Sequence, residues 1–235
     1  MDGQTSPSVL EMNRTALSAA RDAPRGVSTV GSLREALLEE PCYLEIMPAE
    51  IKHRLTVEEY LALERRAESR SEYLDGETFA MVGASRKHNL ISANVLASLH
   101  GQLRGKSCEV YANDMRVRVS ATDLFTYPDV VVVCGPAEFH DTESDTLLNP
   151  RLIVEVLSRT TEDYDRGTKF AHYRTLASLA DYVLIAQDRI HVEHFTKQAD
   201  GRWLLSETDD SGSSLELPSI GCRLVLAEVY ERVFV

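Results

Sequence analysis

Two short aliphatic runs constrain the fold of this chain more than any other feature. Residues 130–133 are four valines in succession, and residues 152–157 are interrupted only by Glu155. Continuous β-branched and aliphatic runs of this length are typical of central strands that are covered on both faces. The sequence therefore predicts an α/β fold in which these two strands are neighbours in one sheet.

Capping, turn and periodicity signals predict the elements around that sheet. Thr56 and Glu59 form a capping box that starts a helix, and Asp75-Gly76 marks a hairpin. The other expected elements are a helix over 85–103, one half-buried strand over 109–120, a helix over 165–177, a strand over 182–186 and an outer hairpin over 190–196 and 203–207. Together they predict a central mixed sheet flanked by helices, with an added outer hairpin.

The first fifty residues differ in composition from the rest. They are rich in Ser, Thr, Gly, Pro and charged residues, and they show no clear hydrophobic periodicity. Ser32 and Glu35 form a capping box. We expect an extension over 1–50, partly disordered with a short helix at 32–40, and one domain over 51–235. The start lacks the basic and apolar segments of a secretory signal, and no apolar run is long enough to span a bilayer. We therefore expect a cytoplasmic protein with no membrane partner.

The spacing of the cysteines also favours a cytoplasmic location. Cys42, Cys108, Cys134 and Cys222 form no C-x-x-C pair of the kind that holds zinc. We expect four free thiols in a reducing compartment.

Two acidic residues enter the apolar sheet and need a compensating charge. Glu155 lies in the middle of the run at 152–157, and Asp129 directly precedes the four valines. A buried carboxylate without a partner is costly, so each needs a cation or a proton. Because the two strands are expected to be adjacent, both carboxylates can reach one metal ion. Lys169, in the first turns of the following helix, can supply a further positive charge.

The sequence around these three residues resembles a known family. Asp129, Glu155 and Lys169 resemble the active-site triad of the PD-(D/E)XK nuclease superfamily. Three motifs of this chain surround them: Tyr127-Pro128-Asp129-Val130, residues 149–158 (NPRLIVEVLS) and residues 164–173 (YDRGTKFAHY). These motifs are similar to those of the Uma2 family of restriction-endonuclease-like proteins. The resemblance continues upstream through residues 72–77 (EYLDGE), His88 and residues 114–119 (DMRVRV), and so covers roughly residues 55–230.

The resemblance implies a restriction-endonuclease-like fold and a metal-dependent endonuclease that hydrolyses phosphodiester bonds, with DNA as the expected substrate. It implies that Asp129, Glu155 and the backbone carbonyl of Val156 hold Mg²⁺ or Mn²⁺, because oxygen ligands suit hard cations. Lys169 would then orient or help to deprotonate the attacking water and stabilise charge on the phosphoryl oxygens. Glu72 would add a further carboxylate or a water-mediated contact to the metal.

One position departs from the wider superfamily. The usual E-x-K pattern would place the lysine at position 157, where this chain has Leu157. The resemblance to the Uma2 family implies that Lys169 on the helix replaces that lysine.

Each of these residues also has a structural interpretation. Lys169 and Asp165 are four positions apart, the spacing of a surface ion pair on a helix. Glu155 would face solvent if its strand lay at an edge, and Asp129 would cap a turn. Glu72 lies in a charged stretch, where solvated glutamates are the rule.

A local excess of basic residues lies between positions 85 and 118. Six basic side chains stand there against two acidic ones, in a chain whose formal net charge is −12. We expect the residues that contact nucleic-acid phosphates to be Arg86, Lys87, His88, Arg116 and Arg118. The alternative is a solvated helix and strand face, with His88 an ordinary helix residue.

A second class of function is also consistent with the sequence. It is a catalytically inactive nucleic-acid-binding or scaffold protein that keeps the nuclease fold. The same metal chemistry would serve RNA or another phosphate ester. Because a cut through both strands of a duplex needs two sites, we expect a homodimer.

Overall fold

A computed structural model describes residues 54–235 of the chain. The extension expected over residues 1–50 and its helix at 32–40 lie outside this range, and the domain boundary near residue 50 stays a prediction. The described residues form a mixed α/β domain, as predicted, and their strands make three sheets rather than one. No helix among them has both the length and the apolar character that crossing a membrane requires.

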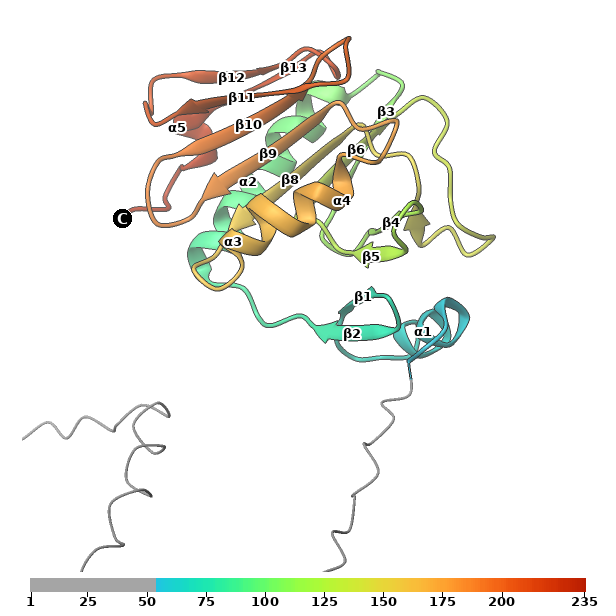
Figure 1. Cartoon of the computed structure of the whole chain (residues 1–235). Helices are drawn as coiled ribbons and strands as arrows, with labels where there is room; N and C mark the ends of the chain where they lie inside the picture. Colours follow the sequence, from blue (N-terminus) through green and yellow to red (C-terminus); the bar gives the residue numbers. More distant parts are fainter. Residues whose placement is uncertain (1–53) are drawn as a thin grey trace, which may run out of the picture. The chain divides into compact units, whose positions relative to one another are not determined.

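The central layer is a mixed six-stranded sheet (Figure 1). Its strands, in spatial order, are β11 (Trp203–Thr208), β10 (Val192–Lys197), β9 (Asp181–Ala186), β8 (Leu152–Leu157), β6 (Val130–Cys134) and β3 (Cys108–Ala112). β8 and β9 run parallel, and the other neighbours are antiparallel. The two aliphatic strands β6 and β8 are adjacent and every residue of β8 is buried, which confirms the prediction for both runs. β10 and β11 form the expected outer hairpin.

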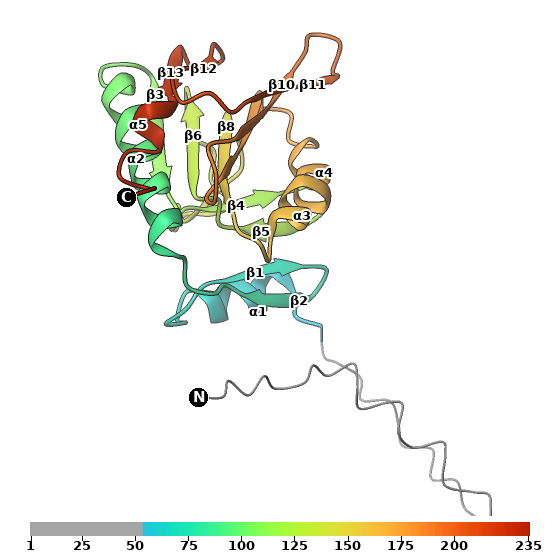
Figure 2. The same ribbon diagram turned by 90° about the vertical axis from the view of Figure 1, so that its left-hand side faces the viewer.

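Both faces of this sheet are covered (Figure 2). One face packs against α2 (Arg86–Leu103), which is capped by Ser85 and buries Ile91, Val95 and Leu99. Alongside α2 lie the hairpin of β12 (Ser214–Leu217) and β13 (Cys222–Val225) and the short helix α5 (Leu226–Val229). The opposite face packs against the helical segment between β8 and β9 and against a second sheet.

The helical segment between β8 and β9 is composite. α3 (Glu162–Tyr164), a π-helical turn (Asp165–Lys169) and α4 (Phe170–Tyr173) follow one another without a break. The predicted β-α-β unit is therefore present, but the helix both begins and ends earlier than the expected range of 165–177. The π-helical turn has no signature in hydrophobic periodicity, which is why the sequence predicted one regular helix.

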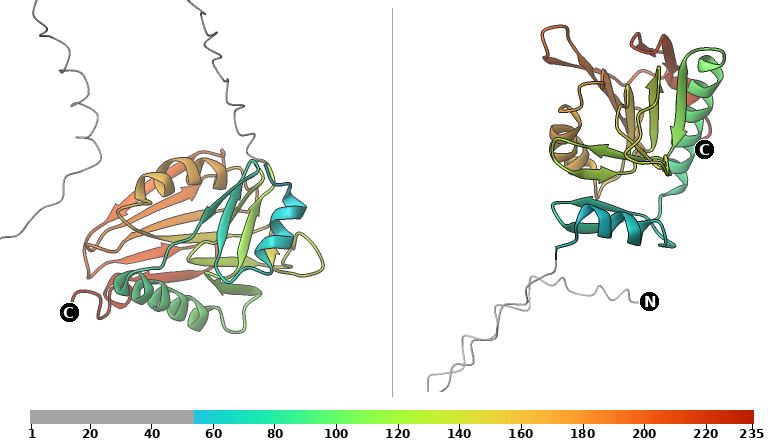
Figure 3. Two further views of the ribbon diagram at one scale, coloured as in Figure 1. Left: turned by 90° about the horizontal axis from the view of Figure 1, so that it is seen from below. Right: turned by 90° about the vertical axis from the view of Figure 1, so that its right-hand side faces the viewer.

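The second sheet carries the N-terminal part of the domain (Figure 3). Its strands, in spatial order, are β2 (Glu77–Ala80), β1 (Ser71–Leu74), β5 (Leu124–Thr126), β4 (Arg116–Val119) and β7 (Thr146–Leu147). Asp75 and Gly76, with φ of 48° and 84°, make the tight turn between β1 and β2 that the sequence predicts. α1 (Val57–Glu64) starts at the predicted capping box and packs Tyr60 against the aromatic rings of Tyr73 and Phe125.

Residues 109–120 do not form one strand, so that prediction is wrong. β3 and β4 belong to different sheets, and a turn at Asn113 and Asp114 separates them, with the N–H of Met115 donating to the carbonyl of Ala112 at 3.0 Å. Asn and Asp favour turns because their side chains tolerate and stabilise turn backbone. This local preference prevails over the alternation of apolar and charged residues on either side.

The prediction of four free thiols is also wrong. Cys108 and Cys134 form a disulfide between β3 and β6, whose register places the two residues directly opposite each other. Such proximity arises from the pairing of strands that are distant in the sequence, so cysteine spacing alone did not indicate it. Cys222 is free and buried, and Cys42 lies outside the described residues.

The tight turn between β1 and β2 generates a stability prediction. Gly76→Ala and Gly201→Ala both place a Cβ on backbone with φ above +80°, a strain of about 1–2 kcal/mol. At Gly76 the Cβ would also lie 2.6 Å from the Cβ of Arg54, whereas at Gly201 it would meet nothing within 4 Å. We expect Gly76→Ala to lower the free energy of unfolding by about 1–3 kcal/mol more than Gly201→Ala in urea denaturation. Equal losses in the two variants would contradict the predicted contact.

Candidate active site

The ammonium group of Lys169 is the centre of a buried ionic cluster. Its Nζ lies 3.0 Å from Glu155 Oε1, 3.0 Å from Glu72 Oε1 and 3.6 Å from Asp165 Oδ1. Glu72 comes from β1, Glu155 from β8, and the other two from the π-helical turn, so the cluster lies where both sheets meet the helical segment. The Lys169 side chain is only 7% exposed, which rules out a surface ion pair even though Asp165 is one of its partners.

Asp129 lies beside this cluster at the start of β6. The register of β6 against β8, continued by one residue, places Asp129 opposite Glu155. Its Oδ2 accepts the N–H of Val156 at 2.7 Å, and its Oδ1 lies 2.7 Å from Nε2 of His88. Asp129 therefore ties β6 to β8 and to α2. Since β8 is a central strand, the interpretation of Glu155 as a solvated edge residue is wrong.

Two further side chains, which the sequence did not indicate as site residues, hold the carboxylates in place. The hydroxyl of Tyr173 donates to Glu155 Oε1 at 2.8 Å, and Thr126 Oγ1 donates to Glu72 Oε1. The two hydroxyls lie 3.4 Å apart, so they link the two glutamates opposite Lys169. The available signal for Tyr173 was its position four residues after Lys169 on the same helix face.

The two glutamates each keep one oxygen open. Among residues 54–235, no hydrogen bond reaches Oε2 of Glu72 or Oε2 of Glu155, because the hydroxyls of Thr126 and Tyr173 both donate to Oε1. Each carboxylate therefore has one fixed oxygen and one oxygen available to a ligand.

Burial and charge shift the proton affinities in this cluster. Burial raises the pKa of Glu155 to about 8, against the opposing effect of Lys169. Burial likewise raises the pKa of Asp165, again opposed by Lys169. For Lys169 burial alone would lower the pKa, but Glu155, Glu72 and Asp165 together hold the pKa well above its ordinary value. The lysine is therefore a permanent cation that does not fully neutralise its neighbours.

The donor set fits a hard divalent cation. The carboxylates of Glu72, Glu155 and Asp165 contact the one lysine and that of Asp129 lies opposite Glu155, so the site holds more carboxylate oxygens than one ammonium group can engage. Carboxylate oxygens are preferred ligands of Mg²⁺ and Mn²⁺. The carbonyl of Val156 stays a predicted ligand; it is the N–H of that residue that bonds to Asp129.

The residues expected to contact nucleic acid divide into two groups. Arg116 is buried and lies 2.9 Å from Asp145 Oδ2, while Arg118 donates to Asp123 at 2.7 Å. We correct the expectation for Arg116, because its guanidinium is enclosed within the domain, and Arg118 is similarly engaged by a carboxylate. Arg86 and Lys87 begin α2, beside His88 and its partner Asp129.

Comparisons with known proteins agree with this fold. The Uma2 family, described as "Putative restriction endonuclease", matches residues 57–227. An uncharacterized protein of Synechocystis sp. is 37% identical over 177 residues, covering 75% of this chain and 92% of its own length. A second from the same organism is 36% identical over 162 residues, covering 69% and 92%. A crystal structure from Anabaena variabilis is described as "a putative nuclease belonging to DUF820". Its match covers 77% of this chain and 99% of that chain, with a TM-score of 0.63. Because the two sequences are only 19% identical, this similarity shows the fold alone.

The raised pKa of Glu155 predicts how stability depends on pH. Below the ordinary glutamate value of 4.5 the carboxyl is protonated in both the folded and the unfolded chain. As pH rises toward 8 the unfolded chain loses this proton first, so each pH unit in that range lowers the free energy of unfolding by up to about 1.4 kcal/mol. In EDTA, urea denaturation should show this decline between about pH 5 and pH 8, and Glu155→Gln should reduce its slope.

Asp165 contributes a decline of the same sign, so Glu155→Gln reduces the slope without abolishing it. A matched control is Glu64→Gln, because Glu64 is a buried glutamate that accepts hydrogen bonds from Ser71 and Tyr127 away from Lys169. The control separates the loss of any buried glutamate from the loss of the one beside Lys169. An unchanged slope in Glu155→Gln would argue against a buried, protonated Glu155.

Proposed function

Since the chain belongs to the Uma2 family of nuclease-like proteins, we propose that it is a divalent-metal-dependent endonuclease that hydrolyses phosphodiester bonds in DNA. One observation carries the proposal. Lys169 Nζ lies 3.0 Å from carboxylates of two different sheets, and Asp129 lies opposite one of them. A buried lysine within an excess of carboxylates supports metal-assisted phosphoryl chemistry rather than a purely structural ion pair.

Asp129 and Glu155 are the proposed ligands of Mg²⁺ or Mn²⁺, with the carbonyl of Val156 as a further proposed ligand. A bound ion of this kind lowers the pKa of a water ligand and polarises a phosphoryl oxygen. Tyr173 holds Oε1 of Glu155 at 2.8 Å, which fixes the carboxylate and leaves Oε2 for the ligand. His88 and the N–H of Val156 orient Asp129 in the same way.

Lys169 is proposed to act as a hydrogen-bond donor. Three carboxylates hold its pKa well above the ordinary value despite burial, so a role in deprotonating water is not supported. A fixed ammonium group stabilises the negative charge that develops on phosphoryl oxygens in the transition state. Glu72, anchored by Thr126, keeps the lysine in position and offers its open Oε2 to a water molecule.

DNA is proposed as the substrate because Arg86 and Lys87 place positive charge on α2 next to His88 and Asp129. A cut through both strands of a duplex requires two such sites. We therefore propose a homodimer in which each copy supplies one site.

The metal-binding proposal predicts that metal binding and cleavage fail together. In calorimetric titration, wild type should bind Mg²⁺ and Mn²⁺, and with either ion it should nick supercoiled plasmid DNA. Asp129→Asn should lose both, with nicking reduced by about 10²-fold or more, because it removes a charged ligand while keeping the shape of the side chain.

Asp181→Asn is the matched control. Asp181 is also a buried aspartate 2.7 Å from a histidine, His194, but it starts β9 at the far end of the β8–β9 ladder from Glu155. It should keep metal binding and nicking. No binding and no nicking in wild type would instead favour a non-catalytic scaffold.

Lys169→Met separates binding from catalysis. Removing the cation leaves the carboxylates more negative, so Mg²⁺ affinity should rise by roughly tenfold. Nicking should fall by about 10²-fold or more because the donor to the phosphoryl oxygens is lost. Calorimetry and plasmid nicking on the same sample measure both effects, and retained nicking would remove Lys169 from the proposed mechanism.

A further inference from the structure

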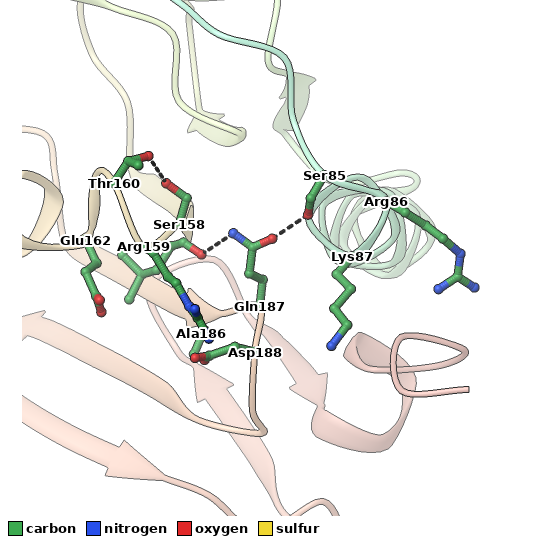
Figure 4. A pocket seen from close by; sticks show the side chains of 11 residues that line it. Ser85, Arg86, Lys87, Ser158, Arg159, Thr160, Glu162, Ala186, Gln187 and Asp188 are labelled. Atoms are coloured by element: carbon green, nitrogen blue, oxygen red, sulfur yellow. Dashed lines mark hydrogen bonds between the residues drawn. The ribbon is translucent and has the colours of Figure 1, made fainter. Parts of the chain in front are cut away.

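Figure 4 shows the lining of a cavity of about 630 Å³. Its walls are the start of α2, the segment after β8 and the turn after β9. Gln187 links these walls, because its Nε2 donates to the carbonyl of Leu157 at 2.8 Å and its Oε1 accepts a hydrogen bond from Ser85. Leu157 follows directly after Val156, whose N–H holds Asp129. The cavity therefore shares a strand end with the carboxylate cluster.

The charged side chains around the cavity leave it cationic. Its two acidic residues are already paired, Glu162 with Arg166 at 2.6 Å and Asp188 with Arg189 at 3.3 Å. In contrast, Arg159 forms no ion pair or side-chain hydrogen bond with any residue of the described range 54–235. The cavity thus offers positive charge that no carboxylate of that range neutralises.

A second wall adds to this charge. Lys87 also has no carboxylate partner within the described part of the chain, and its Nζ lies 4.8 Å from the centre of the Phe234 ring. Its three N–H donors remain available to a ligand. In Figure 4, Lys87 on α2 and Arg159 on the segment after β8 come from separate walls.

The uncharged lining fits a phosphate better than a base. Ser158 and Thr160, whose hydroxyls lie 3.0 Å apart, are of the side-chain types that donate to phosphate oxygens. No aromatic side chain among residues 54–235 lines the cavity, so these residues provide no surface on which a base would stack.

We propose that this cavity is a phosphate subsite, in which Arg159 and Lys87 bind a backbone phosphate of the DNA strand next to the phosphate that is cleaved. This inference rests on the proposed endonuclease function and extends it. It assigns the substrate as a strand that continues beyond the scissile bond, and Arg159 as a residue that positions it.

Salt-dependent DNA binding tests the subsite. Fluorescence anisotropy of a labelled DNA duplex, measured in EDTA to prevent cleavage, gives the slope of log K against log salt concentration. Arg159→Gln should lose one phosphate contact. Relative to wild type, the magnitude of its slope should fall by about 0.9, and its DNA binding at low salt should weaken by about tenfold. Arg151→Gln is the matched control, since Arg151 is an exposed arginine at the opposite end of β8. It should leave the slope unchanged.

The outcomes separate the subsite from the enzyme. Equal slopes for wild type and Arg159→Gln, or no DNA binding by wild type at any salt concentration, would overturn the subsite. A labelled mononucleotide that binds as tightly as the duplex would overturn its assignment to a strand. Wild type and Arg159→Gln could show equal slopes while magnesium-dependent nicking is lost in Asp129→Asn. That result would overturn the subsite and support the endonuclease. A reduced slope in Arg159→Gln without nicking by wild type would keep the phosphate site and remove the endonuclease.

Discussion

The burial of Lys169 among carboxylates is the constraint on which the arrangement of the domain depends. Ionised groups removed from water are costly unless they are paired and hydrogen-bonded. Here the pairing requires three elements at once, since Glu72, Glu155 and Lys169 come from β1, β8 and the helical segment. Any packing that separated one of these elements would leave a buried charge without its partner. The cluster therefore favours one relative placement of the two sheets, in addition to any chemistry it performs.

The sequence predicts those parts of the site that produce a local anomaly. Glu155 was identified because a carboxylate interrupts an aliphatic run, and β6 and β8 were placed side by side because both runs are otherwise β-branched and aliphatic. Glu72 lies in a charged stretch like many solvated glutamates, so only the tertiary structure distinguishes it. Tyr173 has the same appearance in sequence as any buried aromatic residue, and its hydroxyl became informative only with Glu155 beside it. Residues whose role depends on a distant partner are the ones that composition and periodicity miss.

The N-terminal part of the domain fixes the strand that carries Glu72. The residue before it, Ser71, donates from its N–H and its hydroxyl to the buried carboxylate of Glu64, and its carbonyl accepts the Tyr60 hydroxyl at 2.7 Å. Both partners belong to α1, so the helix fixes the start of β1. Glu64 also accepts from Tyr127, which in turn accepts from Arg116. The arginine that the sequence suggested for nucleic-acid contact instead belongs to the support of the site.

The π-helical turn at Asp165–Lys169 determines how this segment responds to a change in its length. A π-helical turn holds an extra residue compared with an α-helical turn. Deleting one residue inside this turn would leave an ordinary α-helical turn, with the residues before and after it in nearly the same relative orientation. Tyr173 would therefore keep its direction toward Glu155. In an ordinary α-helix the same deletion rotates everything beyond it by about 100°, so this segment should tolerate the loss of one residue better than most helices, provided that the residue is neither Asp165 nor Lys169.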